Sequence, residues 1–303
     1  MKHIDSSSCD HYCCGDAMDS RPTGRTTELL LNSAFGDPLT TARFEGLCAG
    51  DPNIEVTRGV VCYAPTLEHL RRAIAEQRNL LICREHPFFL HGGVNYTYDT
   101  EGLETAIKND PVVEAKSNLI AANKLMVYRF GAAWDQFRPQ AQSSALARAL
   151  GLGPAVRPPA DRSRAVVCDL PGETSLLALA QSAVDRLKCR SPRTVGDFHA
   201  KVNRVGVIAG ETDPKEALGK VLSDSKIDGV IAGAGGVIDE VDGAISYFRD
   251  VMATGRRIAL LAVGYGPSED PGVHDMAKWM QGVLPDLQLE WWPTSDPSWI
   301  PRR

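Results

Sequence analysis

Short apolar segments alternate with amphipathic, helix-like segments along most of this chain, and this alternation restricts the possible folds more than any other feature of the sequence. The apolar segments contain too few polar residues to leave one face of a strand in water. Strands that are buried on both faces are typical of parallel sheets that helices cover. The sequence therefore predicts an α/β protein with mostly parallel sheets covered by helices.

The predicted elements follow one another in a regular order. Strands are predicted at residues 56–63, 79–83 and 125–130 in the first half, and at 165–170, 202–209, 229–232 and 258–263 in the second. Helices are predicted at 67–76, 110–122, 143–150, 175–187, 214–222, 242–254 and 271–283, with Thr66, Thr174 and Ser268 as N-caps. Residues 131–135 are expected to form a loop, and the proline-rich end from Trp291 is expected to pack its tryptophans along a groove or against another subunit.

Residues 151–164 are rich in proline, glycine and arginine and show no apolar period, which indicates a boundary between two lobes. A chain of 303 residues is also long enough for two domains of about 150 residues each. We expect a disordered leader at 1–26, a first α/β lobe at 27–150 and a second α/β lobe at 151–303. The leader contains Cys9, His11, Cys13 and Cys14, whose spacing matches no zinc-binding pattern.

Composition and charge argue against several classes of protein. The net charge of −5 and the lack of a Lys/Arg-rich block argue against general nucleic-acid binding, which requires a basic surface. No apolar run approaches the roughly 20 residues of a membrane-spanning helix. The polar N-terminus has no apolar stretch typical of a secretory signal. We therefore expect a cytoplasmic protein that does not contact membranes.

Polar side chains that could carry chemistry follow three of the predicted strands. They are Glu85 with His86, Asp135, and Tyr265 with Glu269. Ligands of open α/β sheets bind at the carboxyl ends of the strands, so these positions are the first candidates for a metal or acid/base site. Each residue also has a structural explanation: a solvated strand end, a turn residue or helix cap for Asp135, and a favourable helix first turn for Glu269.

The glycine-rich segment at 231–238 follows a predicted strand, as a dinucleotide-binding loop would. However, Ile238 stands where the third glycine of that fingerprint belongs, and the acidic residues Asp239 and Glu240 would repel a pyrophosphate. A tight turn explains the glycines better. A nucleotide-dependent oxidoreductase is therefore the least supported function.

Several segments, in this order, resemble one known family. They include LICREHPFF at 81–89, VYRF at 127–130 with WD at 134–135, GYGPSEDPG at 264–272 and DPSW at 296–299. Together they resemble a bacterial branch of the Nif-three-like dinuclear metal-centre proteins, some of which are labelled type-two GTP cyclohydrolase I. The resemblance extends from about Arg43 to the C-terminus, and this chain is identified as a divergent member.

The resemblance implies a two-lobed α/β subunit in a homohexameric ring, with one or two metal ions per subunit in a cleft between the lobes. By the same resemblance, the metal ligands would be Glu85, His86, Asp135, Tyr265 and Glu269. Glu85 and Tyr265 stand where the family has histidine. Because this set is rich in oxygen donors, Mn, Mg or Fe ions are favoured over Zn.

Two functions follow from this resemblance. The first is a metal-dependent, hydrolase-like activity on an unknown small molecule, in which the metal activates water and Glu269 or Glu85 accepts the proton. The second is a non-catalytic, ring-forming scaffold that binds metal or a small molecule through a degenerate site. The loss of the expected histidine at Tyr265 favours the scaffold.

Overall fold

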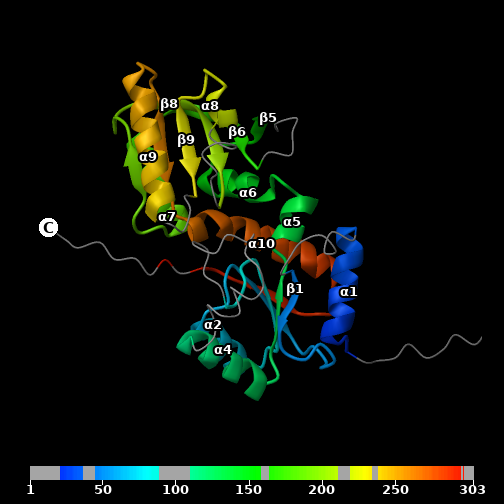
Figure 1. Ribbon diagram of the computed structural model, residues 1–303. Helices are drawn as coiled ribbons and strands as arrows, with labels where there is room; N and C mark the ends of the chain where they lie inside the picture. Colours follow the sequence, from blue (N-terminus) through cyan, green and yellow to red (C-terminus); the bar gives the residue numbers. More distant parts are fainter. Residues whose placement is uncertain are drawn as a thin grey trace, which may run out of the picture.

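The computed structural model describes residues 21–36, 45–88, 110–157, 164–210, 219–233, 238–294 and 296, and within these ranges it contains two β-sheets with helices packed against them (Figure 1). Residues 1–20, which hold the cysteines of the predicted leader, and residues 234–237 of the glycine-rich segment lie outside the described residues. Residues 24–26, predicted as the end of the disordered leader, belong instead to a helix that begins at Gly24. None of the helices in the described ranges combines the length and the hydropathy of a membrane span.

The first sheet contains five strands in the order β1-β4-β3-β2-β11. Their bounds are β1 Gly46–Ala49, β2 Gly59–Cys62, β3 Leu80–Cys83, β4 Met126–Arg129 and β11 Leu289–Trp292. Only β1 is antiparallel to its neighbour, and the other three pairs are parallel. Every residue of β2, β3 and β4 is buried, as the continuous apolar segments predicted.

The second sheet contains six strands in the order β5-β6-β8-β9-β10-β7. Their bounds are β5 Ala155–Arg157, β6 Val166–Ser175, β7 Arg193–Val195, β8 Lys201–Ile208, β9 Gly229–Ala232 and β10 Ala259–Ala262. The pairs β8–β9 and β9–β10 are parallel, and the other three are antiparallel. The α/β class with two helix-covered sheets is thus confirmed, but the prediction of a mostly parallel second sheet is wrong. The short edge strands β5 and β7 carry too little apolar sequence to be recognised.

The helices in the described ranges are α1 Gly24–Phe35, α2 Leu67–Ala75, α4 Pro111–Ala122, α5 Ala132–Phe137, α6 Ala141–Leu150, α7 Leu176–Leu187, α8 Gly219–Leu222, α9 Ile238–Ala253 and α10 Tyr265–Val283. Most of them form where the sequence predicts a helix, but α1 was not predicted and α5 was predicted as a loop. Thr66 caps α2 through its hydroxyl group as predicted, whereas α7 is capped by Ser175 instead of Thr174.

Two helices differ from the predictions in ways that affect the candidate site. Residues 131–135, predicted as a loop, contribute to α5. Helix α10 begins already at Tyr265, so Ser268 is not its N-cap and Pro271 lies inside it. The prediction placed the start at Pro271 because proline is favoured in the first helical turn and disfavoured further along. As a result, Glu269 lies beyond the first turn of α10.

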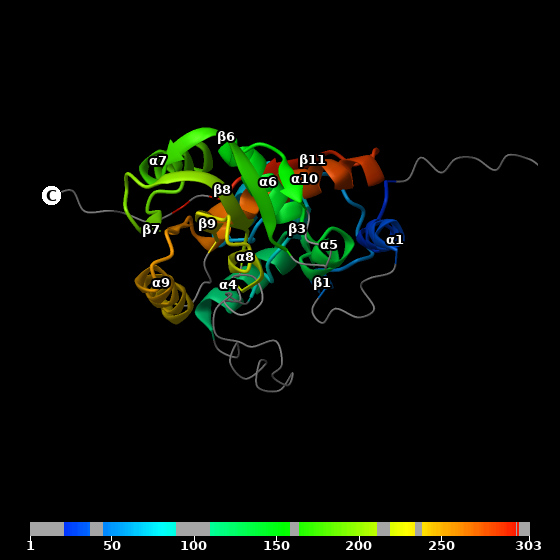
Figure 2. The same cartoon turned by 90° about the horizontal axis from the view of Figure 1, so that it is seen from above.

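Helix α10 packs between the two sheets (Figure 1). It lies against α6 on one side, as Figure 2 shows from above, and against β2 and α1 of the first half. Val273, Met276 and Met280 of α10 belong to the apolar core of the first sheet. The chain then enters β11, which pairs with β2. Trp291 and Trp292, predicted to pack in a groove or against another subunit, are thus part of a strand of the first sheet, while residues 297–303 of the predicted tail lie outside the described residues. The segment 151–303 thus contributes to both sheets.

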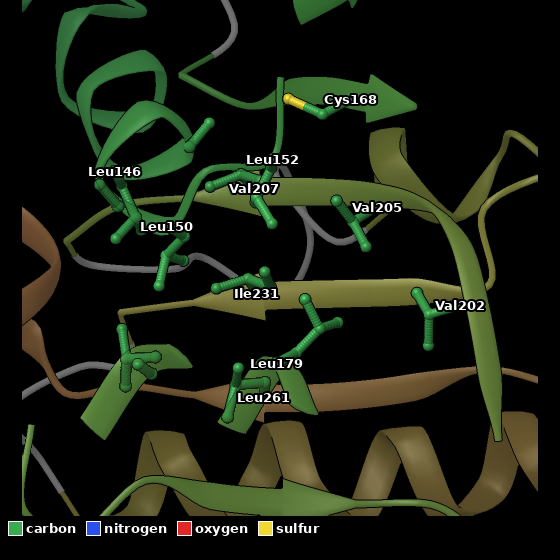
Figure 3. Packing of buried hydrophobic residues seen from close by; sticks show 14 of the residues in the cluster. Leu146, Leu150, Leu152, Cys168, Leu179, Val202, Val205, Val207, Ile231 and Leu261 are labelled. Atoms are coloured by element: carbon green, nitrogen blue, oxygen red, sulfur yellow. The ribbon is translucent and has the colours of Figure 1, made fainter. Parts of the chain in front are cut away.

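A second core lies between α6, α7 and one face of the second sheet (Figure 3). Leu146 and Leu150 of α6 and Leu179 of α7 pack against Val207, Ile231 and Leu261 of successive strands. Full burial of one such side chain contributes about 1.5–3 kcal/mol relative to exposure. Because α6 contacts both this core and α10, it connects the packing of the two halves.

The close contact of α10 with α6 requires a glycine at position 272. A Cβ atom at 272 would lie 1.3 Å from Oε1 and 3.0 Å from Cα of Gln142. We expect Gly272→Ala to lower the free energy of unfolding by about 2 kcal/mol, because the helices must separate or Gln142 must move. Urea denaturation monitored by circular dichroism measures the change.

Gly282 provides the matched control in the same helix, because in the described residues, apart from the neighbouring backbone of the helix itself, no atom lies within 4 Å of a Cβ atom added there. Gly282→Ala should leave stability unchanged or raise it by up to about 1 kcal/mol, through the higher helix propensity of alanine. Equal losses from the two substitutions would contradict the packing explanation.

Asp270 of α10 connects the helix to the residues that follow β11. Its Oδ1 atom accepts hydrogen bonds from the backbone N–H and the hydroxyl group of Thr294, at 3.1 and 3.2 Å. Burial raises the pKa of Asp270 to about 6, although these hydrogen bonds oppose the increase. The folded state therefore binds a proton more tightly than the unfolded state at this position, and the wild-type protein loses stability as the pH rises through this pKa.

Asp270→Asn removes this titration and keeps an oxygen that can accept from Thr294. Relative to wild type, we expect the variant to become more stable as the pH is raised from 4 to 7, with a slope of at most about 1.4 kcal/mol per pH unit. Urea unfolding of both proteins across this range measures the difference. A difference that does not change with pH would show that Asp270 has an unshifted pKa.

Candidate functional site

The candidate site lies where strands of both sheets end beside the first turns of α10. Arg84 and Gly233 directly follow β3 and β9, and Gly210 and Gly264 each stand two residues after the end of β8 and β10. The backbone N–H of Gly210 donates to Ser268 Oγ at 2.9 Å, and this hydroxyl group donates in turn to the carbonyl oxygen of Tyr265. The carboxyl ends of strands from both sheets therefore meet at this place.

Arg84 occupies the centre of this site and is only 3% exposed. Its Nη1 atom donates to the carbonyl oxygen of Gly131 at 3.2 Å. Its Nη2 atom donates to Asp135 Oδ2 at 3.0 Å and to Glu269 Oε1 at 3.3 Å, and its Nε atom forms an ion pair with Glu269 Oε2. One guanidinium thus binds both carboxylates, which the chain supplies from α5 and α10.

Glu269 is fully buried, and its surroundings fit the carboxylate closely. Its Oε2 atom accepts a hydrogen bond of 2.6 Å from Nε2 of Gln142 on α6. A Cβ atom at Gly210 would lie 2.0 Å from Oε1, so only glycine fits at that position. Burial raises the pKa of Glu269 to about 7; the Arg84 charge opposes this shift and the Asp135 charge adds to it.

Asp135 is positioned by the N-terminus of α5. The carboxylate of Glu45 accepts hydrogen bonds from the backbone N–H groups of Ala132 and Ala133, at 3.1 and 3.2 Å, and so satisfies the first turn of this helix. Asp135 Oδ2 also accepts a hydrogen bond of 2.6 Å from Arg164, whose side chain is 45% exposed. Two arginines therefore balance the charge of this aspartate.

Glu85 and Tyr265 lie beside each other next to this network. The Tyr265 hydroxyl donates to Glu85 Oε1 at 3.4 Å, and the Tyr265 ring packs against Tyr63 with 5.7 Å between the ring centroids. Burial, together with the charges of Glu85 and Glu269, raises the pKa of Tyr265 well above its usual value of 10. The phenol therefore stays protonated and serves as a hydrogen-bond donor in this arrangement.

His86 contacts the segment that follows it. Its Nδ1 atom accepts a hydrogen bond of 3.3 Å from the backbone N–H of Phe88, and the two rings meet edge to face. Burial lowers the pKa of His86 to about 4, with the charges of Arg129 and Lys116 adding to the decrease, so the imidazole is neutral at pH 7.

These residues do not fit a dinuclear metal centre as the structure arranges them. Asp135 and Glu269 are brought together, but Arg84 binds both carboxylates. Glu85 is brought to Tyr265, a protonated phenol that is a poor metal ligand. Among the residues that the structure describes, no group of three or more His, Cys, Asp or Glu side chains is placed to hold a metal ion. The five ligand roles inferred from the family resemblance remain predictions.

Sequence reasoning missed Arg84, Gln142 and Arg164 as members of the site. Arg84 stands at the carboxyl end of a buried strand, directly before Glu85, so its position was available as a signal. Gln142 and Arg164 had no such signal, because neither follows a strand.

If the buried ion pair holds the site together, Arg84 and Glu269 should be energetically coupled. A double-mutant cycle of Arg84→Met and Glu269→Gln should give a coupling free energy of about 2 kcal/mol or more, because either single substitution leaves the other charge buried without its partner. Urea denaturation of the two single variants, the double variant and wild type gives this value.

The exposed ion pair between Arg148 and Asp275 is a suitable control, since it also joins α6 to α10. Its coupling should be only about 0.2–1 kcal/mol, because water screens both charges. A coupling for Arg84 and Glu269 that is no larger than this control would contradict the central role of the buried pair.

Comparison with protein families gives one match that covers most of the chain. The family described as Duf34/NIF3 (NGG1p interacting factor 3) matches residues 40–297. No curated protein matches the sequence.

Solved structures of similar fold have low sequence identity to this chain. The hypothetical protein SA1388 of Staphylococcus aureus is 17% identical, with a TM-score of 0.65 over 93% of this chain and 100% of its own. The Bacillus cereus protein related to NIF3 is 14% identical, with a TM-score of 0.64 over 92% of this chain and 99% of its own. Reduced HcgD from Methanocaldococcus jannaschii is 16% identical, with a TM-score of 0.59 over 89% and 97%. These likenesses show a shared fold.

Proposed function

Because the chain belongs to the Duf34/NIF3 family, as a divergent member, we propose that it is a non-catalytic, scaffold-type protein of that family, whose site between the two sheets is closed by its own ion pairs. The observation that carries this proposal is the binding of Arg84 to both Asp135 and Glu269. These are two of the carboxylates that a metal-dependent activity would require.

The chemistry of the paired carboxylates supports this proposal. A metal-dependent hydrolase must present free donor oxygens to the metal and a base to the water that the metal activates. Glu269 is fully buried, and its two oxygens accept from Arg84 and Gln142. Asp135 Oδ2 accepts from Arg84 and Arg164. Arginine is always charged at physiological pH, so Arg84 keeps its positive charge beside both carboxyl groups.

A metal-dependent hydrolase is the second candidate, and one observation favours it. Four of the residues that the family resemblance names as ligands lie close to one another: Asp135 and Glu269 share Arg84, and Tyr265 contacts Glu85. This activity would require Arg84 to leave the carboxylates. A buried guanidinium that leaves its partners exposes three charges to a low-dielectric interior, which is strongly unfavourable.

Self-association into a ring, action in the cytoplasm and binding of a small molecule belong to the same proposal and derive from the family resemblance. Exposed apolar side chains support self-association. Leu29 and Leu30 of α1 and Phe137 of α5 are exposed on helices that contact each other, and a second copy of the chain would cover them.

Metal content and oligomeric state, measured on the same sample, test the proposal. We expect protein purified without chelators to contain fewer than about 0.3 ions of Mn, Fe or Zn per subunit, because a tight site would stay largely filled. Elemental analysis measures the metal, and light scattering after size exclusion should still show an oligomer. Hydrolysis assays with each metal added separately should show no stimulation.

A different set of results would support the hydrolase instead. About one or more ions per subunit, lost on Asp135→Ala while the oligomer remains, together with metal-stimulated hydrolysis, would establish the hydrolase and refute the scaffold.

A further inference from the structure

We propose that Arg84 is a built-in cation that takes the position of a divalent metal ion between Asp135 and Glu269, and that removal of its side chain turns this position into a Mn²⁺-binding site. This inference rests on the proposed function, because it explains why the wild-type site needs no metal.

The first observation that supports this inference is the position of one nitrogen atom of Arg84. Nη2 of Arg84 lies 3.0 Å from Asp135 Oδ2 and 3.3 Å from Glu269 Oε1, so a single positive group bridges two carboxylates. Carboxylates from separate elements that share one cation are the usual arrangement around Mg²⁺ and Mn²⁺. Here α5 and α10 supply the carboxylates, and β3 supplies the cation.

The second observation is the burial of the three charged side chains. Arg84 is 3% exposed, Glu269 is fully buried, and the Asp135 side chain is 10% exposed. Water therefore solvates the two carboxylates poorly, and their charges need a counter-charge or protonation. Arg84 supplies a positive charge to both, and Arg164 supplies a second one to Asp135. A variant without Arg84 has to take a cation from solution, protonate Glu269 or lose stability.

Gln142 completes the surroundings of Glu269. Its side chain is 4% exposed, and its Nε2 atom donates to Glu269 Oε2. Its Oε1 atom lies against Gly272 of α10 and is buried without a hydrogen-bond partner in the part of the chain that the structure describes. Around an ion in place of Arg84, the two carboxylates and water would form an oxygen donor set, which favours Mn²⁺ or Mg²⁺ over Zn²⁺.

The experiment compares Mn²⁺ binding by wild type, Arg84→Ala and Arg84→Met. Alanine removes the charge and leaves space for an ion, whereas methionine removes the charge and fills much of the space. Loss of the free Mn²⁺ signal in electron paramagnetic resonance measures binding. We expect Arg84→Ala to bind about one Mn²⁺ per subunit, at least about tenfold more tightly than wild type or Arg84→Met.

Stability provides a second readout of the same site. At a Mn²⁺ concentration of about a hundred times Kd, the melting temperature of Arg84→Ala should rise by about 5 °C, and that of wild type and Arg84→Met should not change. Adding Asp135→Asn to Arg84→Ala should abolish both the binding and the rise in melting temperature. If Arg84→Ala is unfolded in the presence of chelator, Mn²⁺ should restore its far-ultraviolet circular dichroism.

Three results would overturn the inference. They are a folded Arg84→Ala that does not bind Mn²⁺, an unfolded Arg84→Ala that Mn²⁺ does not restore, and binding by wild type or Arg84→Met that is as tight as by Arg84→Ala. The proposed function fails separately, on metal content and hydrolysis by the wild-type protein. A wild-type protein that holds metal elsewhere would refute the scaffold, and Arg84→Ala would still be expected to gain one further Mn²⁺.

Discussion

A guanidinium buried between two carboxylates imposes the strictest physical requirement in this structure. Each of these charges costs several kcal/mol to remove from water, and only close pairing and additional hydrogen bonds offset that cost. Arg84 meets the requirement through contacts with Asp135, Glu269 and the carbonyl oxygen of Gly131. Strand β3, helix α5 and helix α10 must therefore meet at one point. Small displacements of any of them would leave a charge unpaired in the interior.

Helix α10 connects these buried ion pairs to the rest of the fold. Its first turns carry Tyr265 and Glu269 into the site, its middle packs on α6 through Gly272, and the chain continues into β11 of the first sheet. The second sheet is in turn packed on α6. The relative position of the two sheets and the geometry of the site thus depend on the same few contacts.

The fold of the family is retained here while the chemistry of the site differs from what the family resemblance implies. Similar folds at 14–17% identity share an architecture, and function depends on the particular residues of a site. The residues of this site are paired with one another. By the family resemblance, Tyr265 and Glu85 both stand where histidines are expected, and here Tyr265 donates a hydrogen bond to Glu85. The remaining carboxylates are neutralised by arginine.

The sequence by itself determined the α/β class, the strands β2, β3 and β4, and the beginnings of α2 and α4, because apolar periodicity and capping residues act over a few neighbouring positions. It also indicated that the polar residues after the strands would gather at one end of the sheets. It did not determine the start of α10, where local proline preferences were overridden by packing, or the short edge strands β5 and β7.

Only the tertiary structure decided which charges pair with which. Arg84 and Glu269 are 185 positions apart in the chain, and nothing in the residues around either one indicates the other as its partner. The energy of an ion pair depends on the distance between its atoms and on their burial. Both quantities exist only once the two sheets and α10 are packed together.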